Sequence, residues 1–184
     1  MRGVIVMTII GIIAALTMAV ANNLTQGPIA AAKGRTKYEA LQEIFPFKIA
    51  SVKDSESNGV VFFEVSGTKG ESASALELGT TQGYAGLIEV LIGFDADCNI
   101  LDYKVVTHSE TPGLGDKITQ DDFRAQFRGK GLKNFDWRVN KDGGDVDAVT
   151  AATISSRAIS GALERGLKLF AEKYPNKCAG SKKE

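Results

Sequence analysis

The chain has little of what protein-built metal sites and catalytic centres use. Its 184 residues include one histidine, one tryptophan, four prolines and two cysteines, at positions 98 and 178. Two cysteines so far apart match no zinc motif, and one histidine adds too few ligands to complete a protein-built zinc site. We therefore expect no bound metal. Cys98 and Cys178 could form a disulfide in an exported domain or stay as free thiols, and the sequence leaves both open.

An excess of charge of either sign is also absent. Lysine and arginine total 22, aspartate and glutamate total 22, and the sequence pI is about 6.6. This balance lacks the basic footprint of nucleic-acid-binding proteins, so we expect no nucleic acid partner. The length allows one domain with a short appendage.

Charge is missing altogether from residues 3–21, "GVIVMTIIGIIAALTMAVA". A helix needs about 20 such residues to cross a bilayer. The run is longer than the apolar core of a usual signal peptide, although Ala19–Ala21 fits a cleavage site. We therefore expect a retained single-pass transmembrane anchor over residues 1–24. Because Arg2 precedes the run and several basic residues follow it, charge alone does not decide on which side the remaining chain lies.

The remaining chain reads as an α+β domain with an antiparallel sheet and flanking helices. We expect a helical linker over 25–48, the domain over 49–176 and a flexible tail over 177–184. The patterns predict a turn-rich connector at 22–28, helices at 31–45, 119–127 (capped by Thr119) and about 156–174 (ended by Pro175), strands at 59–67, 84–95, 99–109 and 134–140, and a loop at 70–83. The strands at 84–95 and 99–109 are expected to form a hairpin.

Four small hydroxyl residues crowd the start of the last helix, in "DAVTAATISS" (147–156). Serine and threonine before an amphipathic helix are typical capping residues. A helix N-terminus also attracts phosphate, and a hydroxyl there can bond to it or be esterified by it. Composition alone favours capping.

The same stretch resembles the flavinylation motif of FMN-binding domains. In that family a flavin transferase uses FAD to join the phosphate of FMN to a threonine. The resemblance assigns the leading acid, the first hydroxyl, the motif alanine, the attachment residue and the trailing hydroxyl to Asp147, Thr150, Ala152, Thr153 and Ser155. It implies covalent FMN on Thr153. Ala151 stands where glycine is typical.

A second match lies upstream, where residues 83–118 resemble the central hairpin of the same family and its Glu-Thr-Pro-Gly-Leu-Gly turn. The turn residues here include Glu110, Thr111, Gly113, Leu114 and Gly115. Glycines in such a turn permit positive φ angles and close backbone approach. The resemblance implies that these residues contact the flavin, and we add Tyr84 as a candidate ring contact because it adjoins the segment.

The whole arrangement resembles the G subunits of Rnf-type ion-translocating electron-transport complexes. That resemblance implies a subunit of the cytoplasmic membrane with its FMN domain on the extracytoplasmic side. It implies electron relay between reduced ferredoxin and NAD among the other subunits of the complex, coupled to transport of Na⁺ or H⁺. We expect no catalysis by the subunit alone, because His108 and Ser109 are neighbours on a strand and point to opposite faces.

Two alternatives stay open. One is a C-type subunit of the sodium-pumping NADH:quinone reductase, a related flavoprotein. The other is an anchored extracytoplasmic assembly or binding module without flavin. In that module Thr153 would only cap the helix, and the small residues Gly11, Ala15 and Ala19 would dock a partner helix.

Overall fold

The computed structural model describes residues 2–57 and 59–178, in two compact units divided between Tyr38 and Glu39. The first unit lies within helix α1 (Arg2–Ile44). In the described chain, Gly3–Val20 is the one helical segment long and apolar enough to cross a membrane.

The turn-rich connector predicted at 22–28 is wrong, because α1 is helical through it. Asparagine, glycine and proline favour a break there, whereas helical turns on both sides favour propagation, which adds a hydrogen bond for each residue fixed. Propagation prevails over local propensity in this segment.

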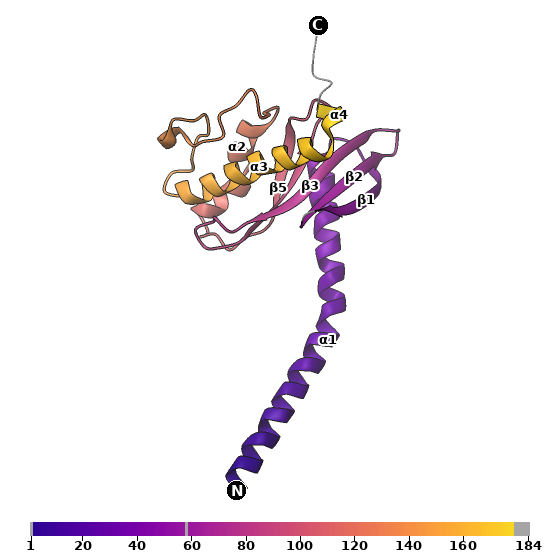
Figure 1. Ribbon diagram of the computed structural model, residues 1–184, viewed down its shortest axis with the longest axis vertical. Helices are drawn as coiled ribbons and strands as arrows, with labels where there is room; N and C mark the ends of the chain where they lie inside the picture. The colour runs from indigo at the N-terminus through magenta and orange to yellow at the C-terminus, as the bar shows by residue number, and fades with distance from the viewer. Residues whose placement is uncertain (1, 58, 179–184) are drawn as a thin grey trace. The chain divides into compact units, whose positions relative to one another are not determined.

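The second unit is built on a five-stranded antiparallel meander (Figure 1). The strands, in chain order and in sheet order, are β1 (Ile49–Ser57), β2 (Val60–Gly67), β3 (Ser72–Thr80), β4 (Ile88–Phe94) and β5 (Ile100–Thr107). Helix α3 (Thr153–Lys173) runs across one face of this sheet. The α+β fold class with an antiparallel sheet is therefore confirmed.

The face under α3 carries the larger hydrophobic core. Leu76, Leu78 and Ile92 point into it, and all three are almost fully buried. Gly166 brings α3 close to the sheet, since a Cβ on that glycine would lie 2.6 Å from Ile92 Cδ1. The absence of a side chain at Gly166 thus sets the spacing between the helix and the strands.

The opposite face is covered by the end of α1. Leu41, Ile44 and Phe45 are buried there against side chains of β2, β3 and β4. The contact is close at Gly93, where a Cβ would lie 2.3 Å from Ile44 Cγ2. This packing is why the compact unit begins at Glu39, ahead of residue 49, where the sequence places the start of the domain.

The sheet confirms some strand predictions and corrects others. β2, β4 and β5 lie within the predicted strands, and β4 pairs with β5 as the expected hairpin. The loop predicted at 70–83 is wrong, because β3 occupies most of it, and β1 was not predicted at all. β3 is rich in small and polar residues, yet it pairs with β2 and β4 on its two sides. Tertiary pairing overrides strand propensity here.

The strand predicted at 134–140 is also wrong. Its alternating burial comes from an aromatic cluster in which Trp137 stacks on Phe127 at 5.8 Å and meets Phe135 edge-on at 5.1 Å. Its one described β-type pairing is an isolated bridge between Val139 and Val146. Side chains that pack alternately on a core can give the period-two pattern of a strand even where the segment does not pair along its length with another strand.

Three short helices replace the single helix predicted at 119–127: η1 (Gly115–Thr119), α2 (Asp121–Arg124) and η2 (Ala125–Phe127). Thr119 does not cap them as predicted. Its hydroxyl donates to the carbonyl of Asp116, and Gln120 occupies the N-cap position of α2. Helices this short have few backbone hydrogen bonds of their own. Contacts of their side chains must therefore fix the segment to the rest of the domain.

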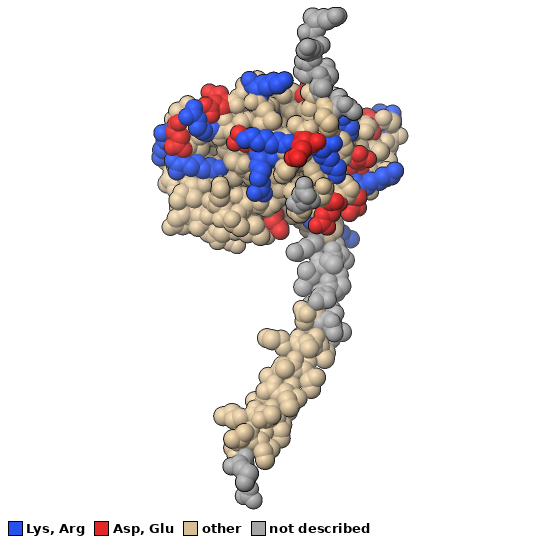
Figure 2. All heavy atoms as spheres, in the orientation of Figure 1, with Lys and Arg blue, Asp and Glu red and all other residues tan. Residues whose placement is uncertain are grey.

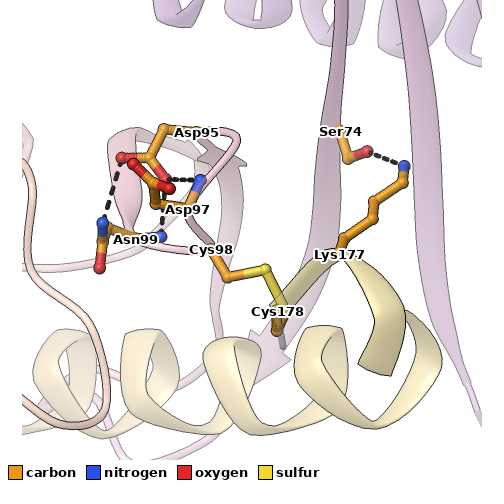
Figure 3. Close-up of a disulfide and its surroundings, with 7 residues drawn as sticks. All are labelled: Ser74, Asp95, Asp97, Cys98, Asn99, Lys177 and Cys178. Carbon is orange, nitrogen blue, oxygen red and sulfur yellow. Dashed lines mark hydrogen bonds between the residues drawn. A yellow bond between two sulfur atoms is a disulfide. The ribbon is translucent and has the colours of Figure 1, made fainter. Parts of the chain in front are cut away.

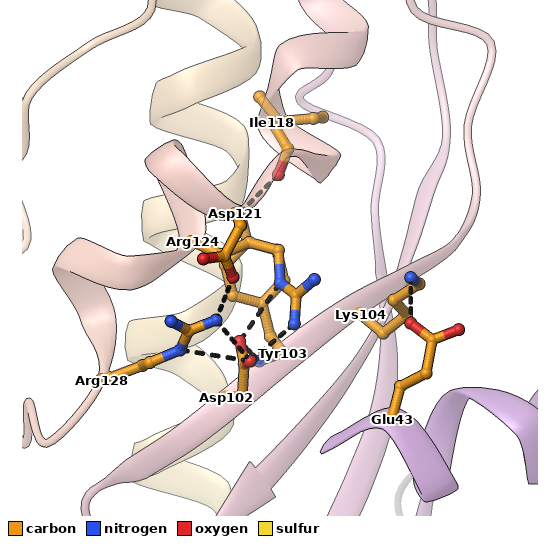
Figure 4. A network of polar contacts seen from close by, with 8 residues as sticks. All are labelled: Glu43, Asp102, Tyr103, Lys104, Ile118, Asp121, Arg124 and Arg128. Atoms are coloured by element: carbon orange, nitrogen blue, oxygen red, sulfur yellow. Dashed lines mark hydrogen bonds and ion pairs between the residues drawn. The ribbon is translucent and has the colours of Figure 1, made fainter.

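A buried ionic network holds this segment on β5 (Figure 4). The Asp102 carboxylate accepts from Arg124 at 2.6 Å and from Arg128 at 2.9 Å. The Tyr103 hydroxyl donates to the carbonyl of Ile118 at 2.6 Å, and burial raises the pKa of that phenol well above its ordinary value. Removing one partner of such a buried pair leaves an uncompensated charge, so the network fixes where η1 and α2 lie.

A disulfide ties the end of the described chain to the sheet (Figure 3). Cys98, in the β4–β5 turn, is bonded to Cys178, the last residue of α4 (Pro175–Cys178). Lys177 also donates to Ser74 of β3. Within the tail predicted over 177–184, the first two residues thus belong to a cross-linked helix, and residues 179–184 lie outside the described residues.

Removing the disulfide is expected to destabilise the domain. Replacing both Cys98 and Cys178 with serine should lower the free energy of unfolding by about 2–4 kcal/mol, because the bridge closes a long loop in the unfolded chain. Urea titration followed by the fluorescence of Trp137, the only tryptophan in the chain, measures this change. Reduction of the wild-type protein should give the same decrease. Equal denaturation midpoints for the oxidised and reduced protein would contradict a stabilising role.

Candidate functional site

A buried carboxylate joins three separate segments of the domain. Glu110 is 4% exposed. One of its oxygens accepts the backbone N–H of Ala85 at 3.1 Å, and the other accepts the Ser155 hydroxyl at 2.5 Å. The loop before β4, the turn after β5 and the first turn of α3 are therefore fastened to one side chain.

Glycine is required around this carboxylate. A Cβ on Gly115 would lie 2.6 Å from one oxygen of Glu110, and a Cβ on Gly83 would lie 2.6 Å from the other. Gly113 has a φ of +76°, which glycine adopts without strain. In the 110–115 turn, Gly115 thus leaves room for the Glu110 carboxylate, and Gly113 allows the backbone to turn.

The hydroxyls before and within the first turn of α3 do not cap the helix. Ala152 occupies the N-cap position, and no side-chain capping bond is made there. Ser155 donates to Glu110, while Ser156 donates to the carbonyl of Ala152 and accepts the N–H of Val149, both at 3.0 Å. The capping explanation that composition favoured is therefore wrong.

The start of α3 consequently keeps unsatisfied donors. Among the described residues, none accepts a hydrogen bond from the backbone N–H of Thr153, Ile154 or Ser155. A helix of 21 residues directs its partial positive charge to this end. The first turn of α3 is thus suited to an anionic group.

Ala151 precedes this turn with a φ of +65°. Left-handed backbone costs about 1–2 kcal/mol for a residue with a Cβ, whereas glycine adopts it freely. The glycine typical of the resembling motif at this position therefore has a conformational reason. Ala151 keeps the same backbone at the expense of strain.

These segments surround a hollow of about 430 Å³. Its lining consists of Tyr84, Glu110, Thr111, Leu114, Gly115, Ala151, Ala152, Thr153, Ile154 and Ser155. Tyr84 is 71% exposed, and Leu114 and Ile154 are each more than 40% exposed, so the rim is apolar and open. In Figure 2 the lower left of the domain, below the N-terminal end of α3 in Figure 1, shows no charged side chains.

The predicted site residues do not all line one hollow. Eight of the lining residues were predicted from the two motifs, and Tyr84 was predicted beside them. Asp147 and Thr150 instead line a second hollow of about 410 Å³ next to Phe123 and Gln126. The Asp147 side chain accepts from Asn140, and its backbone N–H donates to Gln126. Gly113 lines neither hollow.

Two residues at the hollow were not predicted. Ile154 adjoins Thr153 in sequence, and its place within the motif was the available signal. Lys141 comes from a separate turn, yet its ammonium donates to the Thr153 hydroxyl at 3.2 Å. No local sequence pattern indicates that contact, because the folding of residues 141–153 produces it.

Comparisons with known proteins agree on one family. Residues 83–168 match the FMN-binding domain. Over 173 residues the chain is 36% identical to the G subunit of the ion-translocating oxidoreductase complex of Cereibacter sphaeroides, covering 86% of this chain and 78% of that protein. Over 108 residues it is 43% identical to the protein of the same name from Escherichia coli K12, covering 56% and 52%.

A solved structure also resembles the chain. NqrC of Shewanella oneidensis superposes with a TM-score of 0.53, covering 75% of this chain and 72% of that one. At 22% sequence identity this likeness shows a common fold alone. All residues that line the 430 Å³ hollow lie within the matched segment 83–168.

The strain at Ala151 gives a testable difference. Ala151→Gly should raise the free energy of unfolding by about 0.5–1 kcal/mol. Glycine adopts the left-handed backbone without strain, and its greater conformational freedom in the unfolded chain offsets part of that gain. Urea titration followed by Trp137 fluorescence measures the change.

Ala152→Gly is the matched control. Ala152 is buried and has a φ of −131°. Glycine there relieves no left-handed strain, and its added freedom in the unfolded chain offsets the preference for glycine over alanine at an N-cap, so the free energy of unfolding should change little. If Ala151→Gly gained no stability relative to Ala152→Gly, the backbone at Ala151 would not be strained.

Proposed function

Because the chain belongs to the family of ion-translocating oxidoreductase complex G subunits, we propose that it carries FMN covalently as a phosphoester of Thr153. The observation that carries the proposal is the position of the Thr153 hydroxyl. It lies at the edge of the 430 Å³ hollow, in a helix turn whose backbone donors are unsatisfied. A phosphoryl group on this oxygen would meet those donors.

The hollow fits the remainder of FMN. Pockets that bind cofactors have about 300–1,000 Å³ and apolar walls with a few placed polar groups. Tyr84, Leu114 and Ile154 offer apolar surface to a flat ring, while Glu110 and Ser155 already bond to each other and so hold the hollow in shape. FMN, when bound, supplies one- and two-electron redox chemistry, and the protein supplies position and electrostatics.

The two halves of the flavinylation motif have separate roles in this proposal. Ala151, Ala152 and Ser155 line the hollow beside Thr153. Asp147 and Thr150 hold the preceding loop and face outward, where the flavin transferase that matures the protein would meet them. Thr111, Gly113 and Gly115 form the opposite turn.

In the complex, the chain relays electrons between neighbouring redox subunits. The overall reaction is electron transfer between reduced ferredoxin and NAD, coupled to movement of Na⁺ or H⁺. This chain performs no catalysis alone. Gly3–Val20 has no ionisable residue, so this helix offers no ion path and serves as an anchor.

We place the FMN domain, which is the compact unit that begins at Glu39, on the extracytoplasmic side of the cytoplasmic membrane, with the anchor at 1–24. The Cys98–Cys178 disulfide supports this side. Disulfides persist in oxidising compartments and are rare in the cytoplasm.

Loss of the Thr153 hydroxyl should abolish covalent flavin. Thr153→Ala, produced in cells with an active flavin transferase, should show the unmodified mass, whereas the wild type carries an added FMN less one water on the peptide containing Thr153. The hydroxyl makes no capping bond. The free energy of unfolding should therefore change by no more than about 0.5 kcal/mol. Intact mass followed by peptide mapping measures the modification.

Two matched variants accompany that experiment. Thr153→Ser keeps a hydroxyl at the attachment position and should retain flavin. Thr150→Ala removes an exposed hydroxyl of the same motif, and any flavin that this variant takes up should still be attached to Thr153. Stoichiometric covalent flavin in Thr153→Ala would refute the assignment.

The side of the membrane is open to a separate test. External protease added to spheroplasts should digest the domain from Glu39 onward, and inverted vesicles should protect it until detergent is added. Immunoblotting against the domain reads the result. Protection in spheroplasts together with digestion in inverted vesicles would place the domain in the cytoplasm.

A further inference from the structure

Lys141 is the cation placed at the proposed attachment oxygen. It belongs to helix η3 (Asn140–Asp142), in a turn that no motif singles out. Its ammonium nitrogen lies 3.2 Å from Thr153 Oγ1. In the described part of the chain, no carboxylate lies within ion-pair distance of Lys141, and the Thr153 hydroxyl is the acceptor of its side-chain hydrogen bond.

The turn that presents Lys141 is anchored on both sides of it. Asn140 donates to the Asp147 carboxylate, at the start of the motif. Asp142 accepts two hydrogen bonds from Arg157, one turn along α3 from Thr153, at 2.7 and 2.9 Å. These bonds lower the pKa of the Asp142 carboxyl, which stays ionised. Lys141 therefore lies between one residue bonded to Asp147, which starts the motif, and one bonded to Arg157, which directly follows the motif.

The backbone of the turn is also determined. The Asn140 N–H donates to the carbonyl of Val146 at 2.8 Å, and Gly143 ends η3 with a φ of +82°. Gly144 packs so closely that a Cβ would lie 2.1 Å from the carbonyl oxygen of Arg138. Glycines are thus needed at the two positions that direct the turn toward α3.

We propose that Lys141 contacts the phosphoryl group transferred to Thr153 and promotes its transfer. This inference rests on the proposed function. In the transfer, a bond forms between Thr153 Oγ1 and the phosphorus of the FMN half of FAD, the phosphoanhydride bond breaks, AMP leaves and the hydroxyl proton is released. The non-bridging oxygens on that phosphorus are two bonds from Oγ1, within reach of an ammonium that already touches Oγ1.

The positive charge matters because the product keeps an anion at this point. The phosphodiester on Thr153 carries one negative charge. The unsatisfied N–H groups of the first turn of α3 and the Lys141 ammonium would face it from two elements. Arg157 cannot replace the lysine, because its guanidinium is committed to Asp142.

The test measures the rate of flavin incorporation. The purified full-length chain, in detergent, is incubated with flavin transferase and FAD, and covalent flavin is followed by intact mass and in-gel fluorescence. Lys141→Ala should lower kcat for incorporation about tenfold, the value of one charge-assisted hydrogen bond, while KM for the chain stays within about twofold. Lys141→Arg should restore most of the rate, because it keeps a cation.

Lys168→Ala is the control, since it removes an exposed lysine that pairs with Glu164. Lys168 lies about 22 Å along α3 from Thr153, at the rise of an ordinary helix. The variant should incorporate flavin at the wild-type rate. Thermal unfolding of each variant checks that the fold is intact.

The outcomes separate the two proposals. Wild-type kinetics in Lys141→Ala would overturn the role of the lysine and leave Thr153 as the attachment residue. A higher KM with unchanged kcat would overturn it too, because it would show that the transferase contacts Lys141. A wild-type chain that takes no flavin on Thr153 would refute the proposed function itself.

Discussion

The Glu110 carboxylate is the constraint on which the site depends. A buried carboxylate needs hydrogen-bond donors. Its donors come from Ala85 and Ser155, in segments distant along the chain. The glycines at 83 and 115 leave room for it. The hollow therefore exists because one polar side chain accepts hydrogen bonds from a loop and from a helix at once.

The scaffold beneath the site is held from several directions. The sheet is covered on one face by α3 and on the other by the end of α1, with Gly166 and Gly93 permitting close contact. The Asp102 network fixes the short helices that follow the 110–115 turn, and the disulfide fixes the far end of α3 through α4. Such contacts hold the loops around the hollow on a rigid scaffold.

The start of α3 shows how a capping pattern can serve another purpose. Serine and threonine usually satisfy the first N–H groups of a helix. Here Ser155 and Ser156 bond elsewhere, Ala152 takes the N-cap position, and the N–H groups stay available. Strain at Ala151 accompanies this arrangement. Stability is thus given up at the position where an anion would be bound, as is common at functional sites.

The sequence by itself determined the apolar anchor segment, the 84–109 hairpin, the last helix and the two motifs, because each depends on residues close together in the chain. Only the tertiary structure decided that residues 72–80 form a central strand, that the hydroxyls do not cap, that Cys98 meets Cys178 and that Lys141 reaches Thr153. These outcomes depend on partners distant in sequence. Strand pairing, hydrogen-bond choice and contacts between loops are settled only when the chain packs, and local propensities are too small to decide them.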